Sequence, residues 1–234
     1  MTEVRGPTGA LEAQRIDVGS APRTAVVMLH GYAMAAADLS PFAVSLGLPA
    51  VFYVPNAPLE AVPSGRAWWP MDQERRRQAL LRGPRDLADE RPDGAPAARA
   101  LLGDLLAHVR QAHAELPLVV IAFSQGGMLA CDAVLHDEAR LDGLALLSSS
   151  RIDIVDWRQR ADRLRGLPVL VSHGETDDDL AFAAGEALRD FCIEAGAAVT
   201  WVPFPGGHSI PLVVWRAIRR FVAGISPREA PSVP

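Results

Sequence analysis

A serine that follows an apolar run and precedes two glycines is the first feature that could do chemistry. Residues 118–128 read LVVIAFSQGGM, so a buried strand, a sharp turn and the start of a helix follow one another around Ser124. A strained turn of this kind exposes the serine oxygen as a nucleophile, and it tolerates only small residues two positions to either side. Ala122 and Gly126 supply them, although glycine is usual at the first position. The pattern predicts a nucleophilic Ser124, in preference to a serine that only caps a helix.

A nucleophilic serine needs a base, and His208 is the best placed of the six histidines. It follows two glycines at the end of a predicted strand and precedes a predicted helix that opens at Pro211, so it lies on a loop able to reach the serine. His30 and His173 each end a strand in a His-Gly pair, where a side chain that braces a loop by hydrogen bonds is the simpler interpretation. The remaining histidines, His108, His113 and His136, lie in or at the ends of helical stretches.

The base needs a carboxylate that accepts its Nδ1 proton and keeps the ring in its useful tautomer. We expect this acid in the loop 172–180, which reads SHGETDDDL and follows the penultimate predicted strand. Asp177 lies nearest the strand, whereas Asp178 or Asp179 is better placed to cap the helix that follows. Position alone favours Asp177 and leaves its two neighbours open.

Two backbone N–H groups are candidates for stabilising a developing oxyanion. One belongs to Gln125, directly after the serine, and the other to Tyr32, in the loop that follows the first clear strand. The alternative for Tyr32 is a tyrosine packed after a turn glycine. We expect the Tyr32 ring near the substrate pocket, with Trp68 and Trp69 as further candidates, one ring in the site and the other in packing.

The elements that must position these residues alternate along the chain. Short apolar runs separated by helical patterns are typical of an α/β fold, with a mostly parallel central sheet buried by helices on both faces. The expected strands are 24–29, 50–54, 118–123, 143–147, 168–172 and 199–202, and the expected helices are 95–114, 125–136, 179–195 and 211–222.

We expect one catalytic domain over residues 24–225, preceded by an extension over 1–23 that could add an edge strand and followed by a flexible tail over 226–234. Residues 59–96 interrupt the alternation with proline, glycine and mixed charge. This lid-like insertion is either a lid or binding loop, or a surface excursion with a short solvated helix around residues 75–81 whose arginines, Arg75, Arg76 and Arg77, face the solvent.

Composition excludes several classes of function. The 234 residues carry a net charge of -5, which gives no reason to expect nucleic acid as a partner. The chain has no lysine, which excludes lysine-dependent mechanisms, and its two cysteines form no metal or disulfide motif. The polar N-terminus has no apolar stretch that would serve as a signal or membrane anchor, so we expect a cytoplasmic protein. The oligomeric state stays open, a homodimer included.

With these residues in view, the chain resembles the phospholipase/carboxylesterase family, which includes acyl-protein thioesterases and has the α/β-hydrolase fold. The similarity runs over about residues 24–222 and depends on five short motifs: LHG at 29–31, PNAP at 55–58, FSQGG at 123–127, HGETD at 173–177 and GHSI at 207–210.

The resemblance implies hydrolysis of carboxylic esters or thioesters without a metal or cofactor. Carried over by position, it assigns Ser124 as nucleophile, Asp177 as acid and His208 as base, and it assigns Tyr32 and Gln125 as oxyanion donors. It thereby selects Asp177 from the three adjacent aspartates. An amide or peptide hydrolase of the same fold is the alternative, and a non-catalytic binding protein with that fold is a further one.

Overall fold

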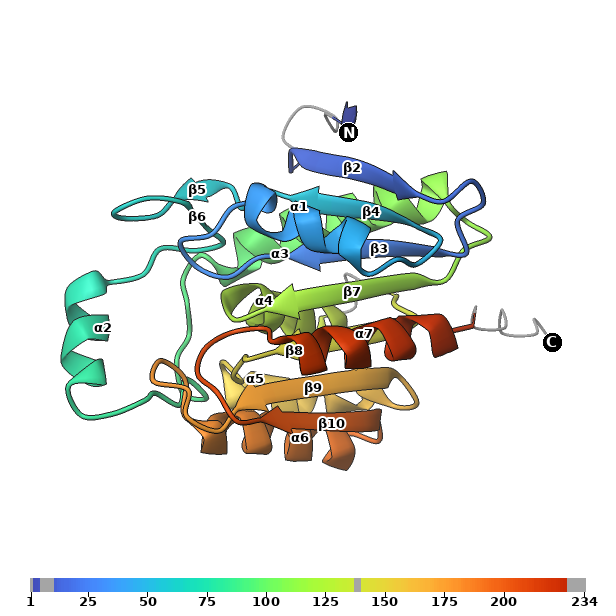
Figure 1. Cartoon of the computed structure of the whole chain (residues 1–234). Coiled ribbons are helices and arrows are strands. Elements are labelled where there is room, and N and C mark those ends of the chain that lie inside the picture. The colour runs from blue at the N-terminus through green and yellow to red at the C-terminus, as the bar shows by residue number, and fades with distance from the viewer. Residues whose placement is uncertain (1, 5–10, 137–139, 227–234) are drawn as a thin grey trace.

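The computed structural model describes residues 2–4, 11–136 and 140–226, of which residues 2–4 are described by their backbone alone. Within this part of the chain one large sheet has the strand order β1-β2-β4-β3-β7-β8-β9-β10 (Figure 1). The first two strands, β1 (Thr2–Val4) and β2 (Ala13–Val18), pair antiparallel, and every pair from β4 to β10 is parallel. The parallel strands are β3 (Thr24–Leu29), β4 (Ala50–Pro55), β7 (Leu118–Phe123), β8 (Gly143–Leu147), β9 (Pro168–Gly174) and β10 (Ala198–Phe204).

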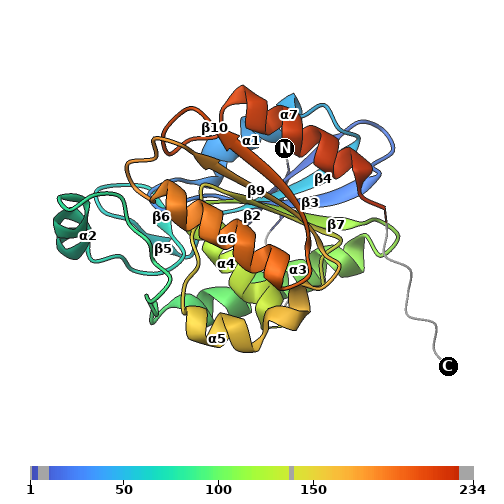
Figure 2. The same cartoon turned by 90° about the horizontal axis from the view of Figure 1, so that it is seen from below.

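Helices cover both faces of the sheet (Figure 2). On one face lie α1 (Ala36–Ser45) and α7 (Leu212–Gly224), and on the other lie α3 (Ala95–Ala112), α4 (Gln125–Leu135), α5 (Ile154–Gln159) and α6 (Phe182–Glu194). Successive side chains of a strand point to opposite faces. Val120 of β7 therefore packs in the core beneath α3 to α6, and Ile121 packs in the core beneath α1 and α7. Burial on both faces explains why the central strands are apolar throughout.

The α/β architecture and the six apolar strands are confirmed, with strand and helix ends that differ from the prediction by a few residues. The extension over 1–23 supplies β1 and β2, and the antiparallel β2 pairs with β4. The elements that were not predicted include α1, α5 and the 3₁₀ turn at Ala161–Leu164. The expected tail falls on residues 227–234, outside the described residues, except for Ser226.

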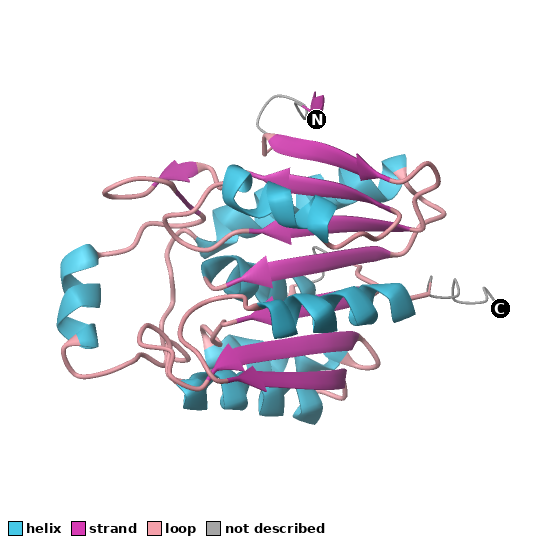
Figure 3. Ribbon diagram, viewed as in Figure 1, coloured by secondary structure: helices cyan, strands magenta, loops and turns pink. Residues whose placement is uncertain are grey.

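The carboxyl ends of the parallel strands meet at one edge of the sheet, and the insertion over residues 59–96 lies beyond that edge (Figure 3). It contains a small hairpin of β5 (Leu59–Glu60) and β6 (Arg66–Ala67), followed by α2 (Gln73–Leu80). None of the α2 residues is buried, in agreement with the predicted solvated helix.

Among the described residues, no helix is both long enough and apolar enough to cross a membrane.

Candidate active site

Ser124 occupies a strained turn between β7 and α4. Its φ of 53° and ψ of -118° lie outside the regions that non-glycine residues prefer, a conformation that costs about 1–3 kcal/mol and concentrates at functional sites. The carbonyl of Ser124 accepts the first helical N–H groups, from Gly127 at 2.9 Å and Met128 at 3.1 Å. Ser124 is the N-cap residue of α4, but its side chain makes no capping hydrogen bond, so the hydroxyl does not cap the helix.

The glycines after the serine are required because neighbouring segments approach them closely, backbone at Gly126 and a side chain at Gly127. A Cβ at Gly126 would lie 2.6 Å from the carbonyl oxygen of His30, and a Cβ at Gly127 would lie 2.7 Å from the Oγ of Ser149. Both separations are too short for real atoms. The small residues of the motif therefore let the turn and α4 lie directly against β3 and β8.

The structure brings the three predicted side chains together in one hydrogen-bonded chain. His208 lies in the loop between β10 and α7, and Asp177 lies in the loop after β9. The imidazole Nδ1 donates to Asp177 Oδ2 at 2.7 Å, and the Ser124 hydroxyl donates to His208 Nε2 at 3.0 Å. An ionised carboxylate only accepts hydrogen bonds, so it fixes the proton of the neutral imidazole on Nδ1 and leaves Nε2 free to accept the serine proton.

The Asp177 carboxylate is fully enclosed and satisfied on both oxygens. Its Oδ1 accepts the backbone N–H groups of Asp179 and Leu180, each at 2.9 Å, while Oδ2 faces His208. Burial alone would raise the pKa of Asp177, but the hydrogen bond and charge of His208, together with these two N–H groups, hold the pKa below its usual value. The carboxylate is thus ionised at neutral pH.

Histidines 30 and 173 brace loops, as the sequence predicts. His30 donates from Nδ1 to the Gly31 carbonyl at 2.7 Å and accepts from the Ala57 N–H at 3.1 Å. His173 is completely buried, and its Nε2 donates to the Leu180 carbonyl at 3.0 Å and lies 3.3 Å from Asp177 Oδ2. Desolvation by burial lowers the pKa of both rings, so they remain neutral.

The two predicted oxyanion donors lie beside Ser124. Tyr32 follows Gly31, where a Cβ would come within 3.1 Å of the Ser124 Cβ, and Gln125 is the first residue of α4. Within the described residues neither backbone N–H donates a hydrogen bond to the protein. Both N–H groups are therefore available to a ligand.

A cavity of about 700 Å³ opens beside Ser124 and His208. Tyr32 and Trp69 line it, together with apolar side chains such as Met128. The Tyr32 hydroxyl donates to the Val62 carbonyl at 3.2 Å, which joins the ring to the insertion. Trp68 is almost fully buried and donates its indole N–H to the His30 carbonyl at 2.8 Å. One tryptophan thus forms part of the pocket wall and the other anchors the insertion to the sheet.

The Gln125 side chain makes two hydrogen bonds that sequence reasoning missed. Its side-chain amide accepts from the Trp68 N–H at 3.0 Å and donates to the Trp69 carbonyl at 3.1 Å, so it holds the backbone of both tryptophans. No local pattern in the sequence could have predicted these hydrogen bonds, because Trp69 and Trp68 lie 56 and 57 residues before Gln125 in the chain.

We expect Gln125→Leu to destabilise the protein by about 1–3 kcal/mol for each of the two backbone groups left unpaired, while the Gln125 backbone N–H stays in place. The unfolding midpoint in denaturant measures the loss. Gln78→Leu is the matched control, since Gln78 is exposed on α2 and its side chain donates a hydrogen bond to Glu74 of the same exposed helix. Equal midpoints for the two variants would contradict a role for Gln125 in holding the pocket wall.

Two interpretations of charged residues were wrong. Asp178 and Asp179 do not cap α6, because that helix begins at Phe182 and Ala181 is its N-cap residue. Arg76 does not simply face solvent. It forms an ion pair with Asp179 at 2.8 Å, and Arg85 binds the other oxygen of the same carboxylate. The Asp179 carboxylate therefore binds two guanidinium groups of the insertion and does not cap a helix.

No group of three or more metal-ligating side chains that could hold a metal ion occurs in the part of the chain that the structure describes.

Three features together define an α/β-hydrolase. They are the parallel sheet with antiparallel strands at its start, the serine turn after β7, and the aspartate and histidine that follow β9 and β10. The chain belongs to the Phospholipase/Carboxylesterase family, whose sequence profile matches residues 12–226.

Similar proteins carry related names. The chain is 28% identical over 117 residues to acyl-protein thioesterase 1 of Neurospora crassa, a match that covers 48% of this chain and 48% of that protein. It is 37% identical over 98 residues to carboxylesterase SOBER1 of Arabidopsis thaliana, covering 39% of this chain and 41% of that protein. The matched part thus spans less than half the length of each of these relatives.

Solved structures show the same fold. The crystal structure of esterase PE8 superposes with a TM-score of 0.78 at 24% identity, covering 93% of this chain and 100% of that chain. Acyl-protein thioesterase 2 of Zea mays superposes with a TM-score of 0.70 at 20% identity, covering 90% of this chain and 97% of that chain.

Proposed function

We propose that this protein is a serine hydrolase that cleaves carboxylic esters or thioesters through an acyl-enzyme on Ser124. The observation that carries the proposal is the hydrogen-bonded chain from Ser124 to His208 to Asp177, with separations of 3.0 and 2.7 Å, at the wall of a cavity. Each member faces its neighbour at a distance suited to proton transfer or orientation.

In the first half of the reaction the Ser124 oxygen attacks the carbonyl carbon of the substrate, and its proton passes to His208 Nε2. Negative charge then gathers on the former carbonyl oxygen. The N–H groups of Tyr32 and Gln125 are our proposed donors to that oxygen, and their freedom from other hydrogen bonds within the described residues supports the role. The intermediate collapses, the bond to the alcohol or thiol breaks, and the imidazolium returns its proton to the leaving group.

In the second half a water molecule attacks the acyl carbon and gives its proton to His208. The bond to Ser124 breaks, the serine oxygen recovers a proton from the imidazolium, and the carboxylic acid leaves. Asp177 stays ionised throughout, since its role is to orient the ring and to stabilise the positive charge that the ring carries for part of each half-reaction.

The names of similar proteins support esters and thioesters as the substrate class. Relatives are named acyl-protein thioesterase and carboxylesterase, and a thioester and an ester present the same carbonyl to the serine. The partner that we propose is a small-molecule ester or thioester. The cytoplasmic location stays a prediction.

A fluorophosphonate probe tests the proposal directly, because it forms a covalent adduct with an activated serine. We expect one adduct per chain, located on Ser124 by peptide mass spectrometry, and none on Ser124→Ala. The absence of labelling on the folded wild-type protein would overturn the proposal.

A substrate panel separates esters from amides. Nitrophenyl esters and acyl thioesters of graded chain length should be cleaved, and nitroanilides of the same acyl groups should react far more slowly. Amide cleavage as fast as ester cleavage would favour a peptidase instead.

A further inference from the structure

The orientation of the Asp177 carboxylate, the acid of the site, depends on two neighbouring backbone N–H groups. Asp177 Oδ1 accepts the N–H groups of Asp179 and Leu180, and these bonds fix one oxygen of the carboxylate while the other faces His208. The orientation of Asp177, and through it that of His208, therefore depends on where residues 179 and 180 are held.

The chain that holds these residues comes from the insertion, about 94 positions away in sequence. The Arg85 N–H donates to the Asp179 carbonyl at 2.9 Å, and the Ala181 N–H donates to the Arg85 carbonyl at 2.9 Å. This arrangement is an isolated parallel bridge between Arg85 and Leu180. The acid loop is thus paired, over one residue, with the segment that follows α2.

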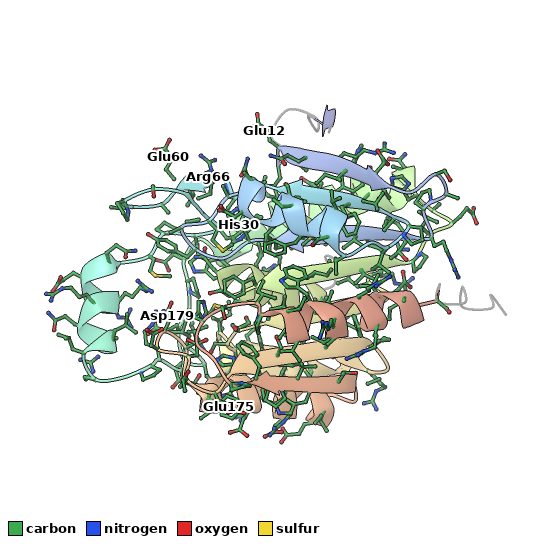
Figure 4. All side chains as sticks on the ribbon, in the orientation of Figure 1. Glu12, His30, Glu60, Arg66, Glu175 and Asp179 are labelled. Atoms are coloured by element: carbon green, nitrogen blue, oxygen red, sulfur yellow. The ribbon has the colours of Figure 1, made fainter. Side chains whose placement is uncertain are left out.

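An ion pair strengthens the same junction. The Asp179 carboxylate accepts from Arg85 on Oδ1 and from Arg76 on Oδ2, the latter at 2.8 Å. Only 18% of the Asp179 side chain and 12% of the Arg85 side chain are exposed, so solvent screens this pair weakly. Figure 4 places Asp179 at the side of the molecule that faces α2.

The two arginines stabilise the negative charge of the Asp179 carboxylate. Burial alone would raise the pKa of Asp179, but the hydrogen bonds and charges of Arg76 and Arg85 hold that pKa below its usual value. The Nε atoms of both arginines are buried and have no hydrogen-bond partner among the described residues, so these guanidinium groups depend on Asp179 for compensation.

We propose that Asp179, held by Arg85 and Arg76, is a positioning residue for the catalytic acid. Through it the insertion acts on the catalytic geometry as well as on the pocket wall. The inference depends on the proposed function, because it assigns Asp179 an effect that passes through Asp177. A small displacement of a catalytic group costs rate more than binding, so the signature is a lower kcat.

The first experiment compares Asp179→Asn, which keeps the side-chain shape and removes the charge, with Arg77→Gln. Arg77 is exposed, and within the part of the chain that the structure describes it pairs only with Glu74 of its own helix, so it serves as the matched control. We expect Asp179→Asn to lower kcat for a nitrophenyl ester about 10- to 100-fold with little change in KM, and Arg77→Gln to leave both unchanged. Assays run well below the unfolding midpoint of each variant.

A double-mutant cycle separates positioning from a general structural role. If Asp179 acts through Asp177, adding Asp179→Asn to Asp177→Asn should lower kcat by less than twofold more. Two results would overturn the inference and leave the proposed function standing. One is an equal fall in kcat when Asp179→Asn is introduced into the wild type and into Asp177→Asn. The other is a wild-type kcat for Asp179→Asn alone. Wild-type kcat for Asp177→Asn would instead overturn the assignment of the acid itself.

Discussion

Replacing Ser124 by alanine should reduce kcat for a nitrophenyl ester by at least about 10⁴-fold, because the variant has no oxygen to attack the carbonyl carbon. His208→Ala should lose a similar factor, since the serine proton then has no acceptor. The two losses should not add, because serine and histidine act as one unit. Any residual rate reflects the oxyanion donors and binding alone. Steady-state kinetics of the two single variants and the double variant measure all three losses.

The folded state should survive these changes. Ser124 makes no capping bond through its side chain, and alanine meets the same backbone strain at φ 53°. We expect the unfolding midpoint to stay close to that of the wild type. Ser45→Ala provides a control at an exposed serine near the end of α1, with wild-type rate expected. A loss smaller than tenfold in Ser124→Ala, which is about 1.4 kcal/mol of barrier, would mean that another group is the nucleophile.

Asp177→Asn should lower kcat by about 10³- to 10⁴-fold, by analogy with the corresponding change in a well-studied serine protease triad. The hydrogen bonds around Asp177 explain why. Because the backbone N–H groups of Asp179 and Leu180 require an acceptor, the asparagine oxygen must take the Oδ1 position, and its NH₂ group then faces His208 Nδ1. The ring must accept there, so its proton moves to Nε2, where it blocks proton transfer from the serine.

Asp178→Asn is the matched control, because Asp178 is the adjacent aspartate and its side chain is exposed. We expect it to keep the wild-type kcat. Measurements of kcat, KM and unfolding midpoint on both variants separate a loss of catalysis from a loss of folding. If Asp177→Asn keeps the wild-type rate while Asp178→Asn loses it, the acid has been assigned to the wrong carboxylate.

The parallel strands were predictable because burial on both faces leaves a continuous apolar run, and such runs stand out from their neighbours. The turn at Ser124 was predictable for a related reason, since the close approach of backbone at Gly126 admits no side chain. In both cases a local steric or solvation requirement restricts the residue types.

Helix α1 was missed because its residues give a weak periodic signal. It has Pro41 in its interior, its apolar and small residues are mixed, and its N-cap residue is Ala35, which cannot cap through a side chain. Packing of Leu39 and Ala43 against the sheet stabilises a helix that local preferences do not favour.

Sequence alone narrowed the acid to three adjacent aspartates, and the family resemblance selected Asp177. The different environments of these aspartates come from tertiary structure. Asp177 is enclosed by backbone N–H groups and His208, Asp178 is exposed, and Asp179 is bound by arginines from the insertion.

The sequence by itself determined the α/β class and the order of the strands along the chain, and it singled out Ser124 and His208 as candidates, because each depends on a local pattern of burial or on a sharp turn. Only the tertiary structure decided that Gln125 holds the backbone of Trp68 and Trp69, and that Arg85 binds Asp179. These contacts join segments far apart in the chain. The type of a residue determines which hydrogen bonds and charges its side chain can offer, and the fold determines which distant partner lies within reach.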